Sequence, residues 1–273
     1  MSLPEFYEGL WDLATSDPAR SVDWIREGYV RCVVKEGIAP RKAGRSGLLA
    51  DVGCGTGAYS REFSRTSKLT FVGIDLSANA LREARRQLVI KHEPRCLGFA
   101  QGDAARLPMD SSTFDLIFCA HVLEHIPQDE ATLGELHRVL KNGGYMRLIV
   151  PNSLDRMFPL FRPLERRLGQ LGHLREYTAD DLSKELAAHD FRVHRVCYSD
   201  FFLAWVLFRV EETLRSMTRR SAFVRKVNRF MLQRRILCRV IARGSSFGIY
   251  WENRILAKCS LGMNISCIAQ RVE

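Results

Sequence analysis

Residues 48–57 read Leu-Leu-Ala-Asp-Val-Gly-Cys-Gly-Thr-Gly, an apolar run followed at once by alternating glycines. The apolar run predicts a buried strand, and the residues from Ala58 onward predict a helix. Glycines at 53, 55 and 57 let the backbone turn sharply and approach a ligand closely, where a Cβ atom would collide. In open α/β sheets such a ligand lies at the carboxyl end of the strand. The stretch therefore predicts a strand, a glycine-rich binding loop and a helix.

Outward from this loop, short apolar runs alternate with helical stretches, which predicts βαβ units and a mostly parallel sheet. The expected strands are 48–52, 69–74, 96–101, 114–120, 145–150, 191–198 and 264–272. The expected helices are 58–64, 78–89, 130–140 and 179–189, and we expect Asn142-Gly143-Gly144 to stop the third of them.

The composition is that of an ordinary globular protein, with 273 residues, 46% of them hydrophobic and 26% charged. This excludes a mostly disordered chain, a collagen-like repeat and a disulfide-stapled miniprotein. Lys and Arg number 41 against 31 Asp and Glu, a net charge of +10. The whole surplus lies in 213–243, which holds ten basic and no acidic residues. Such a segment indicates an anionic partner, either a membrane surface or nucleic acid.

The cysteines and the chain's first residues predict a cytoplasmic protein. The eight cysteines form no C-x-x-C pair, so we expect reduced thiols. The first residues lack the basic and then apolar pattern of a signal peptide. The longest apolar run, 201–208, is much shorter than the roughly 20 residues that a membrane span needs. We expect no metal site, since we identify no cluster of paired carboxylates in the sequence.

Three later motifs decide between two cofactor classes. Gly53-x-Gly55-x-x-Ala58 alone also fits a dinucleotide fingerprint. However, the second expected strand ends in Gly-Ile-Asp75, the third in Gly-Asp103, and the fourth runs into His121-Val-Leu-Glu-His125. Together with Leu-Lys-Asn-Gly-Gly144, these motifs resemble the class I S-adenosylmethionine-dependent methyltransferases, in the branch that includes the ubiquinone-type O-methyltransferases. The resemblance covers 48–152 strongly and 173–198 more weakly.

The resemblance implies a single α/β domain over 1–273 with a Rossmann-like fold. Its seven-stranded sheet would be mostly parallel, with an antiparallel last strand. We expect an N-terminal helical lid over 1–47, a core over 48–198 and 262–273, and a helical insert over 199–261 between the sixth and seventh strands. In this fold that insert joins the sheet at the carboxyl edge, which also holds the cofactor.

The resemblance further implies S-adenosylmethionine as the cofactor. The glycine loop would hold its methionine part, Asp51 would order its amino group, Asp75 its ribose, Asp103 its adenine, and His121 with Val122 would line the sulfonium. The full expected set is Asp51, Gly53, Cys54, Gly55, Thr56, Gly57, Asp75, Leu76, Asp103, Ala104, His121 and Val122. Two plainer interpretations stay open: Asp103 as a turn residue, and Cys54 as a small residue in a tight loop.

Methyl transfer depends mainly on alignment of donor and acceptor, which can supply roughly 7–11 kcal/mol. A general base helps only when a hydroxyl or ammonium must lose a proton. His125 is our candidate for this base, with packing at a helix start as the alternative; Glu124 is a weaker candidate. Tyr7, Trp11 and Trp24 would cover the cofactor, or simply pack an amphipathic helix.

Two segments at the expected active-site rim, 151–172 and 213–243, combine apolar and basic residues. They predict a platform that meets anionic lipids, so we expect a peripheral enzyme on the cytoplasmic membrane face with a lipid-linked or membrane-associated acceptor. The alternative is an ordinary lid over a site for a soluble small molecule. Methylation of RNA and a non-catalytic scaffold are further alternatives that the sequence favours less.

Overall fold

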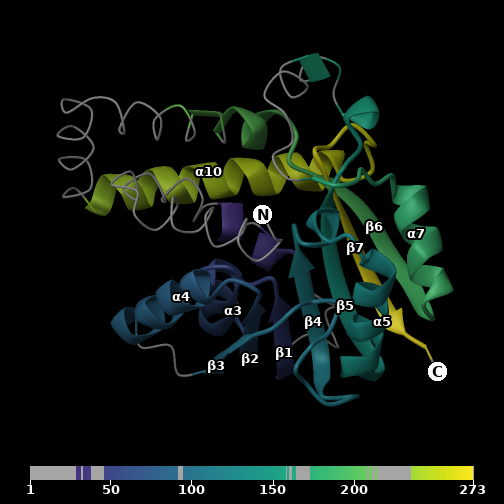
Figure 1. Ribbon diagram of the computed structural model, residues 1–273. Helices are drawn as coiled ribbons and strands as arrows, with labels where there is room; N and C mark the ends of the chain where they lie inside the picture. The colour runs from purple at the N-terminus through teal and green to yellow at the C-terminus, as the bar shows by residue number, and fades with distance from the viewer. Residues whose placement is uncertain are drawn as a thin grey trace.

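The computed structural model describes residues 29–31, 33–37, 46–91, 95–157, 159, 162–163, 173–207, 209–210, 213 and 235–272. Seven strands form one sheet in the order β3-β2-β1-β4-β5-β7-β6 (Figure 1). β7 pairs antiparallel with both β5 and β6, and the other pairs are parallel. This confirms the expected α/β fold, with its mostly parallel sheet and antiparallel last strand.

The elements follow one another as the sequence predicts. The strands are β1 (Ser46–Val52), β2 (Lys68–Asp75), β3 (Cys96–Gln101), β4 (Phe114–Ala120), β5 (Leu140–Pro151), β6 (Phe191–Ser199) and β7 (Asn264–Arg271). The α-helices are α3 (Ala58–Thr66), α4 (Ala78–Lys91), α5 (Asp129–Val139), α7 (Ala179–Ala188) and α10 (Arg235–Leu256). Two short 3₁₀ helices, η2 (Leu123–His125) and η3 (Leu154–Arg156), follow β4 and β5.

The central strands are buried on both faces because their alternate side chains enter two cores. In β4, Ile117 and Cys119 join the core that contains side chains of α5 and α7. Leu116 and Phe118 point the other way, into the core that contains Phe63 of α3 and the helical residues Val30, Val33 and Val34. Burial on both faces is typical of strands in a parallel sheet and explains their nearly continuous apolar sequence.

The sequence prediction is wrong at the start of β5. The preceding helix ends at Val139, and β5 begins at Leu140 rather than at Tyr145. Phe114 of β4 pairs with Leu140, whereas Leu116 pairs with Tyr145, so residues 141–144 form a bulge within the strand. Gly143 has a φ of 74°, which suits glycine and lets the chain leave and rejoin the ladder.

The insert between β6 and β7 contains a helix whose limits differ from those expected. α10 begins inside the basic stretch 213–243 but continues to Leu256, beyond the expected end at Arg243. Figure 1 shows it running across the end of the sheet at which β4 terminates. Its buried Asn253 accepts a hydrogen bond from the backbone of Asp200, directly after β6, at 2.8 Å. The helix therefore lies at the carboxyl edge of the sheet, as expected for the insert.

A buried arginine attaches the N-terminal helical residues to the sheet. Arg147 in β5 is fully buried and donates to the backbone oxygens of Val33 and Gly37 at 2.6 and 3.0 Å. It also forms an ion pair with Glu36 at 2.6 Å and donates to Ser266 of β7 at 2.9 Å. The expected lid residues Tyr7, Trp11 and Trp24 lie outside the described residues, as does most of 213–243.

Candidate functional site

The loop after β1 is the tight turn that its glycines predict. Gly53, Gly55 and Gly57 have φ values of 69°, 52° and 71°, a region that side chains rarely adopt. The amides of Gly53 and Cys54 both donate to the carbonyl of Ile74, at 2.8 and 3.0 Å. A Cβ atom on Gly53 would lie 2.1 Å from Cγ2 of Val122. The loop and the residues after β4 are therefore in direct contact at the carboxyl edge of the sheet.

Asp75, at the end of β2, orients this loop. Its Oδ2 accepts from the amide of Gly55 at 2.7 Å, and its Oδ1 accepts from the amide of Ser77 at 2.9 Å. The side chain thus lies beside the loop at the carboxyl end of β2, and its expected contact with a ribose diol stays a prediction.

Asp51 lies under the loop. Its side chain is buried and accepts a short hydrogen bond from the hydroxyl of Ser60 in α3. Burial raises the pKa of Asp51 from 3.8 to about 7, although the bond from Ser60 opposes this rise. A cationic ligand group nearby would favour the ionised carboxylate, as expected of a residue that orders an amino group.

Asp103 and Cys54 have visible structural roles. Exposed Asp103 accepts from the amide of Ala105 at 2.9 Å, which is the turn that the sequence left open as an alternative. The same residue and the half-buried Ala104 still lie at the carboxyl edge, so their adenine contact stays a prediction. Cys54 is buried against Gly73, where a Cβ atom would lie 2.9 Å from its sulfur. Burial raises the pKa of its thiol well above the ordinary value, which favours packing over nucleophilic chemistry.

The residues after β4 surround a buried carboxylate. His121 has a left-handed φ of 57°, and its Nδ1 lies 3.5 Å from Oε1 of Glu124. Glu124 is fully buried, and neither of its carboxylate oxygens accepts a hydrogen bond from a described residue. Burial by itself raises the pKa of Glu124. Interactions with His121 and His125 lower it by more than burial raises it, so the pKa lies below its ordinary value. The carboxylate is therefore ionised and faces imidazoles.

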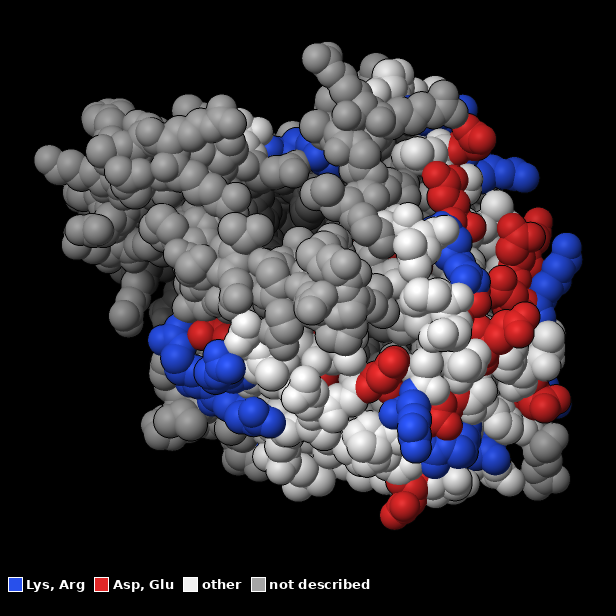
Figure 2. Space-filling model, in the orientation of Figure 1, with Lys and Arg blue, Asp and Glu red and all other residues white. Residues whose placement is uncertain are grey.

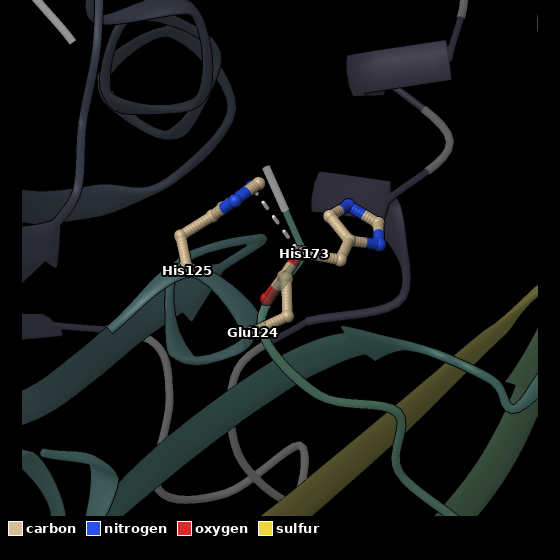
Figure 3. A group of neighbouring side chains, drawn as sticks. All are labelled: Glu124, His125 and His173. Atoms are coloured by element: carbon tan, nitrogen blue, oxygen red, sulfur yellow. Dashed lines mark ion pairs between the residues drawn. The ribbon is translucent and has the colours of Figure 1, made fainter. Parts of the chain in front are cut away.

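His125, the candidate base, lies beside the same carboxylate. Its Nε2 is 3.9 Å from Oε1 of Glu124, and its side chain is 20% exposed. A third residue, His173, comes from the segment before α7, and its ring is 4.9 Å from that of His125. Figure 3 shows the two imidazoles on either side of Glu124. His173 was not predicted from the sequence, because no local spacing connects it to 121–125.

The described residues thus bring most of the expected site together. Four segments follow parallel strands at their carboxyl ends. They are the glycine loop with Thr56, the end of β2 with Asp75 and Leu76, the turn with Asp103 and Ala104, and the pair His121 and Val122. Glu124, His125 and His173 each offer one atom to a group in which all three atoms lie within 4.8 Å of one another. The edge therefore gathers most of the expected cofactor-binding residues and, next to them, a cluster able to handle a proton or a cation.

Comparison with known proteins agrees with this arrangement. Residues 50–148 match the family model described as a methyltransferase domain. A sterol 24-C-methyltransferase of Kluyveromyces lactis is 28% identical over 151 residues, covering 54% of this chain and 40% of the relative. A ubiquinone/menaquinone biosynthesis C-methyltransferase of a Ruegeria species is 30% identical over 141 residues, covering 49% and 55%. The structure of the cyclase SpnF superposes with a TM-score of 0.60 at 18% identity, covering 90% of this chain and 80% of that one.

The fold is the Rossmann-like fold of class I S-adenosylmethionine-dependent methyltransferases. Within the chain, residues 50–148 contain a methyltransferase domain. The chain spans about half the length of the sterol and quinone methyltransferases that it matches. Among the described helices, none combines the length and the apolar character needed to span a bilayer.

Proposed function

We propose that the protein transfers a methyl group from S-adenosylmethionine to an O, N or C acceptor. The observation that carries this proposal is the contact of the glycine loop with Asp75 on one side and Val122 on the other. In that place the loop backbone and Asp51 would face the methionine part, Asp75 the ribose and Asp103 the adenine. The donor methyl would then lie near His121 and Val122.

The chemistry asks little of the side chains. The acceptor attacks the methyl carbon, the carbon–sulfur bond breaks, its electron pair stays on sulfur, and S-adenosylhomocysteine leaves. Holding the two partners in line provides most of the rate enhancement. For a hydroxyl or ammonium acceptor a proton must also be lost, and His125 is the candidate base because it lies beside Glu124 at the end of β4.

Equilibrium binding tests the cofactor directly. Calorimetric titration of the full chain with S-adenosylmethionine and with S-adenosylhomocysteine should show saturable binding at one site. Asp75→Asn should weaken both ligands at least about tenfold, since it removes a charge-assisted bond worth roughly 1.5–3 kcal/mol. The control is Asp110→Asn, an exposed carboxylate whose side chain lies on another loop. Equal binding by the two variants would contradict the ribose assignment.

We further propose that the acceptor is lipid-linked or membrane-associated. Support comes from α10, whose Phe247, Trp251 and Ile255 recur every four residues and are 66%, 45% and 75% exposed. The opposite side of the helix is committed to the protein, because Ile249 and Asn253 are buried. The Kluyveromyces and Ruegeria relatives are named for sterol and quinone methylation, which also favours an apolar acceptor.

The charge distribution supports the same proposal. On the face in Figure 2, mostly basic side chains of the described residues gather at the lower left, and acidic and basic side chains are interspersed at the right. The sequence confines the net surplus of basic residues to 213–243. An apolar stripe on α10 next to a basic segment would dip into acyl chains and meet lipid phosphates.

Co-sedimentation with vesicles tests membrane association. Vesicles containing anionic phosphatidylglycerol should bind the chain more strongly than neutral ones. Trp251→Ser with Ile255→Ser should reduce binding, whereas Leu97→Ser, which changes an equally exposed residue on the edge strand β3, should not. Neutralising the basic segment should also reduce binding, through variants of Arg225, Lys226, Arg229 and Arg235. Unchanged binding in all variants would instead favour the lid over a site for a soluble acceptor.

A further inference from the structure

The geometry points to a divalent-cation site formed by Glu124, His125 and His173, and we propose that it binds an ion of the zinc, iron or cobalt type. The three side chains offer one carboxylate oxygen and two imidazole nitrogens, all within 4.8 Å of one another (Figure 3). The sequence led us to expect no metal site because it shows no paired carboxylates, and the second imidazole comes from a distant segment.

The buried carboxylate is the strongest observation. Glu124 has no exposed surface, and neither of its oxygens accepts a hydrogen bond from a described residue. Burying a carboxylate costs free energy unless a cation or several donors compensate it. The imidazoles of His121 and His125 lie 3.5 and 3.9 Å from Oε1 of Glu124, beyond the length of a strong hydrogen bond. A metal ion in the cluster would bind this carboxylate directly.

The ligand atoms of the cluster lie slightly farther apart than they would around a bound ion. Ligand atoms at about 2.1 Å from a tetrahedral ion lie roughly 3.4 Å apart. Nε2 of His125 is already 3.9 Å from Oε1 of Glu124. The two rings meet edge to face, at an interplanar angle of 69°. Bringing Nε2 of His125 and Oε1 of Glu124 to the separation of two ligands requires a closure of about 0.5 Å.

The backbone holds the distant ligand in place. The amide of Leu174, next to His173, donates to the carbonyl of Glu124 at 2.8 Å. Arg175 donates to the carbonyl of Pro127 at 2.7 Å and forms an ion pair with Asp129 at the start of α5. The segment that carries His173 is thus fixed to η2 and to the start of α5 on either side of the cluster. Such preorganisation is what a metal site requires of its ligands.

The donor set selects the class of ion. Two imidazoles and one carboxylate suit borderline ions such as Zn²⁺, Fe²⁺ and Co²⁺, whereas Mg²⁺ and Ca²⁺ prefer all-oxygen sites. Three protein ligands leave at least one position open, as in catalytic sites. A structural role alone would more commonly fill all four positions with protein ligands.

The location of the cluster suggests a role for the coordination position of the ion that no protein ligand fills. This role rests on the proposed methyl transfer. Glu124 and His125 come two and three positions after Val122, which touches the glycine loop. An acceptor hydroxyl bound to the ion would have a lowered pKa and release its proton to solvent, so that its oxygen attacks the methyl carbon as the carbon–sulfur bond breaks. His125 would then be a ligand rather than the base. We favour the ion because a single base does not explain two imidazoles around one buried carboxylate.

Metal binding is tested without cofactor or acceptor, so that its failure differs from failure of the proposed function. The full chain is stripped with chelator, dialysed and titrated calorimetrically with Zn²⁺, and the bound metal is quantified by mass spectrometry. We expect one ion per chain. Glu124→Gln and His173→Ala each change a ligand and should weaken zinc binding by at least about 10- to 100-fold, the loss seen when only a residue that supports a ligand is changed. His194→Ala, on β6 and hydrogen-bonded to Gln270, should leave zinc binding unchanged.

Co²⁺ provides a readout of the ligands themselves. The loaded wild-type chain should show visible ligand-field absorption that His173→Ala shifts or abolishes. Circular dichroism of the stripped variants checks that they fold, and S-adenosylmethionine binding by His173→Ala should stay near the wild-type value. If the wild type binds zinc no more tightly than Glu124→Gln and His173→Ala do, the proposal is overturned and His125 remains the candidate base.

Discussion

Gly53→Ala tests the loop more sharply than any other single change. The residue has a φ of 69°, and a Cβ atom there would lie 2.1 Å from Cγ2 of Val122. The left-handed backbone costs a non-glycine residue roughly 1–2 kcal/mol. Overpacking against Val122 adds about 1–3 kcal/mol. We therefore expect the free energy of unfolding to fall by about 2–5 kcal/mol.

Gly57→Ala is the matched control. Its φ of 71° is almost the same, but the nearest atom to its added Cβ would be Cζ of Phe99 at 3.3 Å. This variant should show the backbone cost with little of the steric cost. Val122→Ala removes the methyl group that the new Cβ meets, so the double variant of Gly53 and Val122 should recover about 1–3 kcal/mol relative to the sum of the single changes.

Urea unfolding measures these differences through the shift of the midpoint at constant slope. Calorimetric titration then measures how the same changes affect the affinity for S-adenosylmethionine. Gly53→Ala should weaken this binding more than Gly57→Ala does. If Gly53→Ala costs no more than Gly57→Ala, and Val122→Ala recovers nothing, the close packing of the loop on the end of β4 is refuted.

Three further outcomes follow from buried groups. Arg147→Met should lower the free energy of unfolding in urea by about 3–5 kcal/mol, because it leaves Glu36 and two backbone oxygens without their buried donor. Burial raises the pKa of Asp51 to about 7, so between about pH 4 and 7 the folded protein keeps a proton that the unfolded chain releases. The free energy of unfolding should therefore fall as the pH rises through this range. Asp51→Asn should flatten this part of a plot of the urea midpoint against pH. Cys54 should stay unmodified by iodoacetamide, measured by peptide mass spectrometry, since burial raises its pKa and blocks access.

Local patterns predicted most of the sheet because each parallel strand is a short apolar run bounded by a turn. The strands at 96–101 and 114–120 were predicted with the bounds that the structure gives them. The start of β5 was missed because Asn142-Gly143-Gly144 is typical of a helix stop and a turn. Only the pairing with β4 shows that the chain bulges there and keeps the strand.

Some residues of the candidate site could also be predicted from the sequence, and others could not. Residues directly after a strand, such as Asp75 and His121, could be placed from the sequence, because parallel strands end at one edge of the sheet. His173 could not, since its position depends on hydrogen bonds from Leu174 and Arg175 to residues about 50 positions earlier in the chain. The burial of Glu124 likewise depends on this packing, so the motif that contains Glu124 does not show that its carboxylate is removed from water.

Titration of the full chain with S-adenosylmethionine, with S-adenosylhomocysteine as competitor, tests the proposed methyl transfer most directly. We expect saturable binding at one site, displacement of the donor by the product, and at least about tenfold weaker binding by Asp75→Asn. A folded wild-type chain that binds neither ligand would contradict the proposed function.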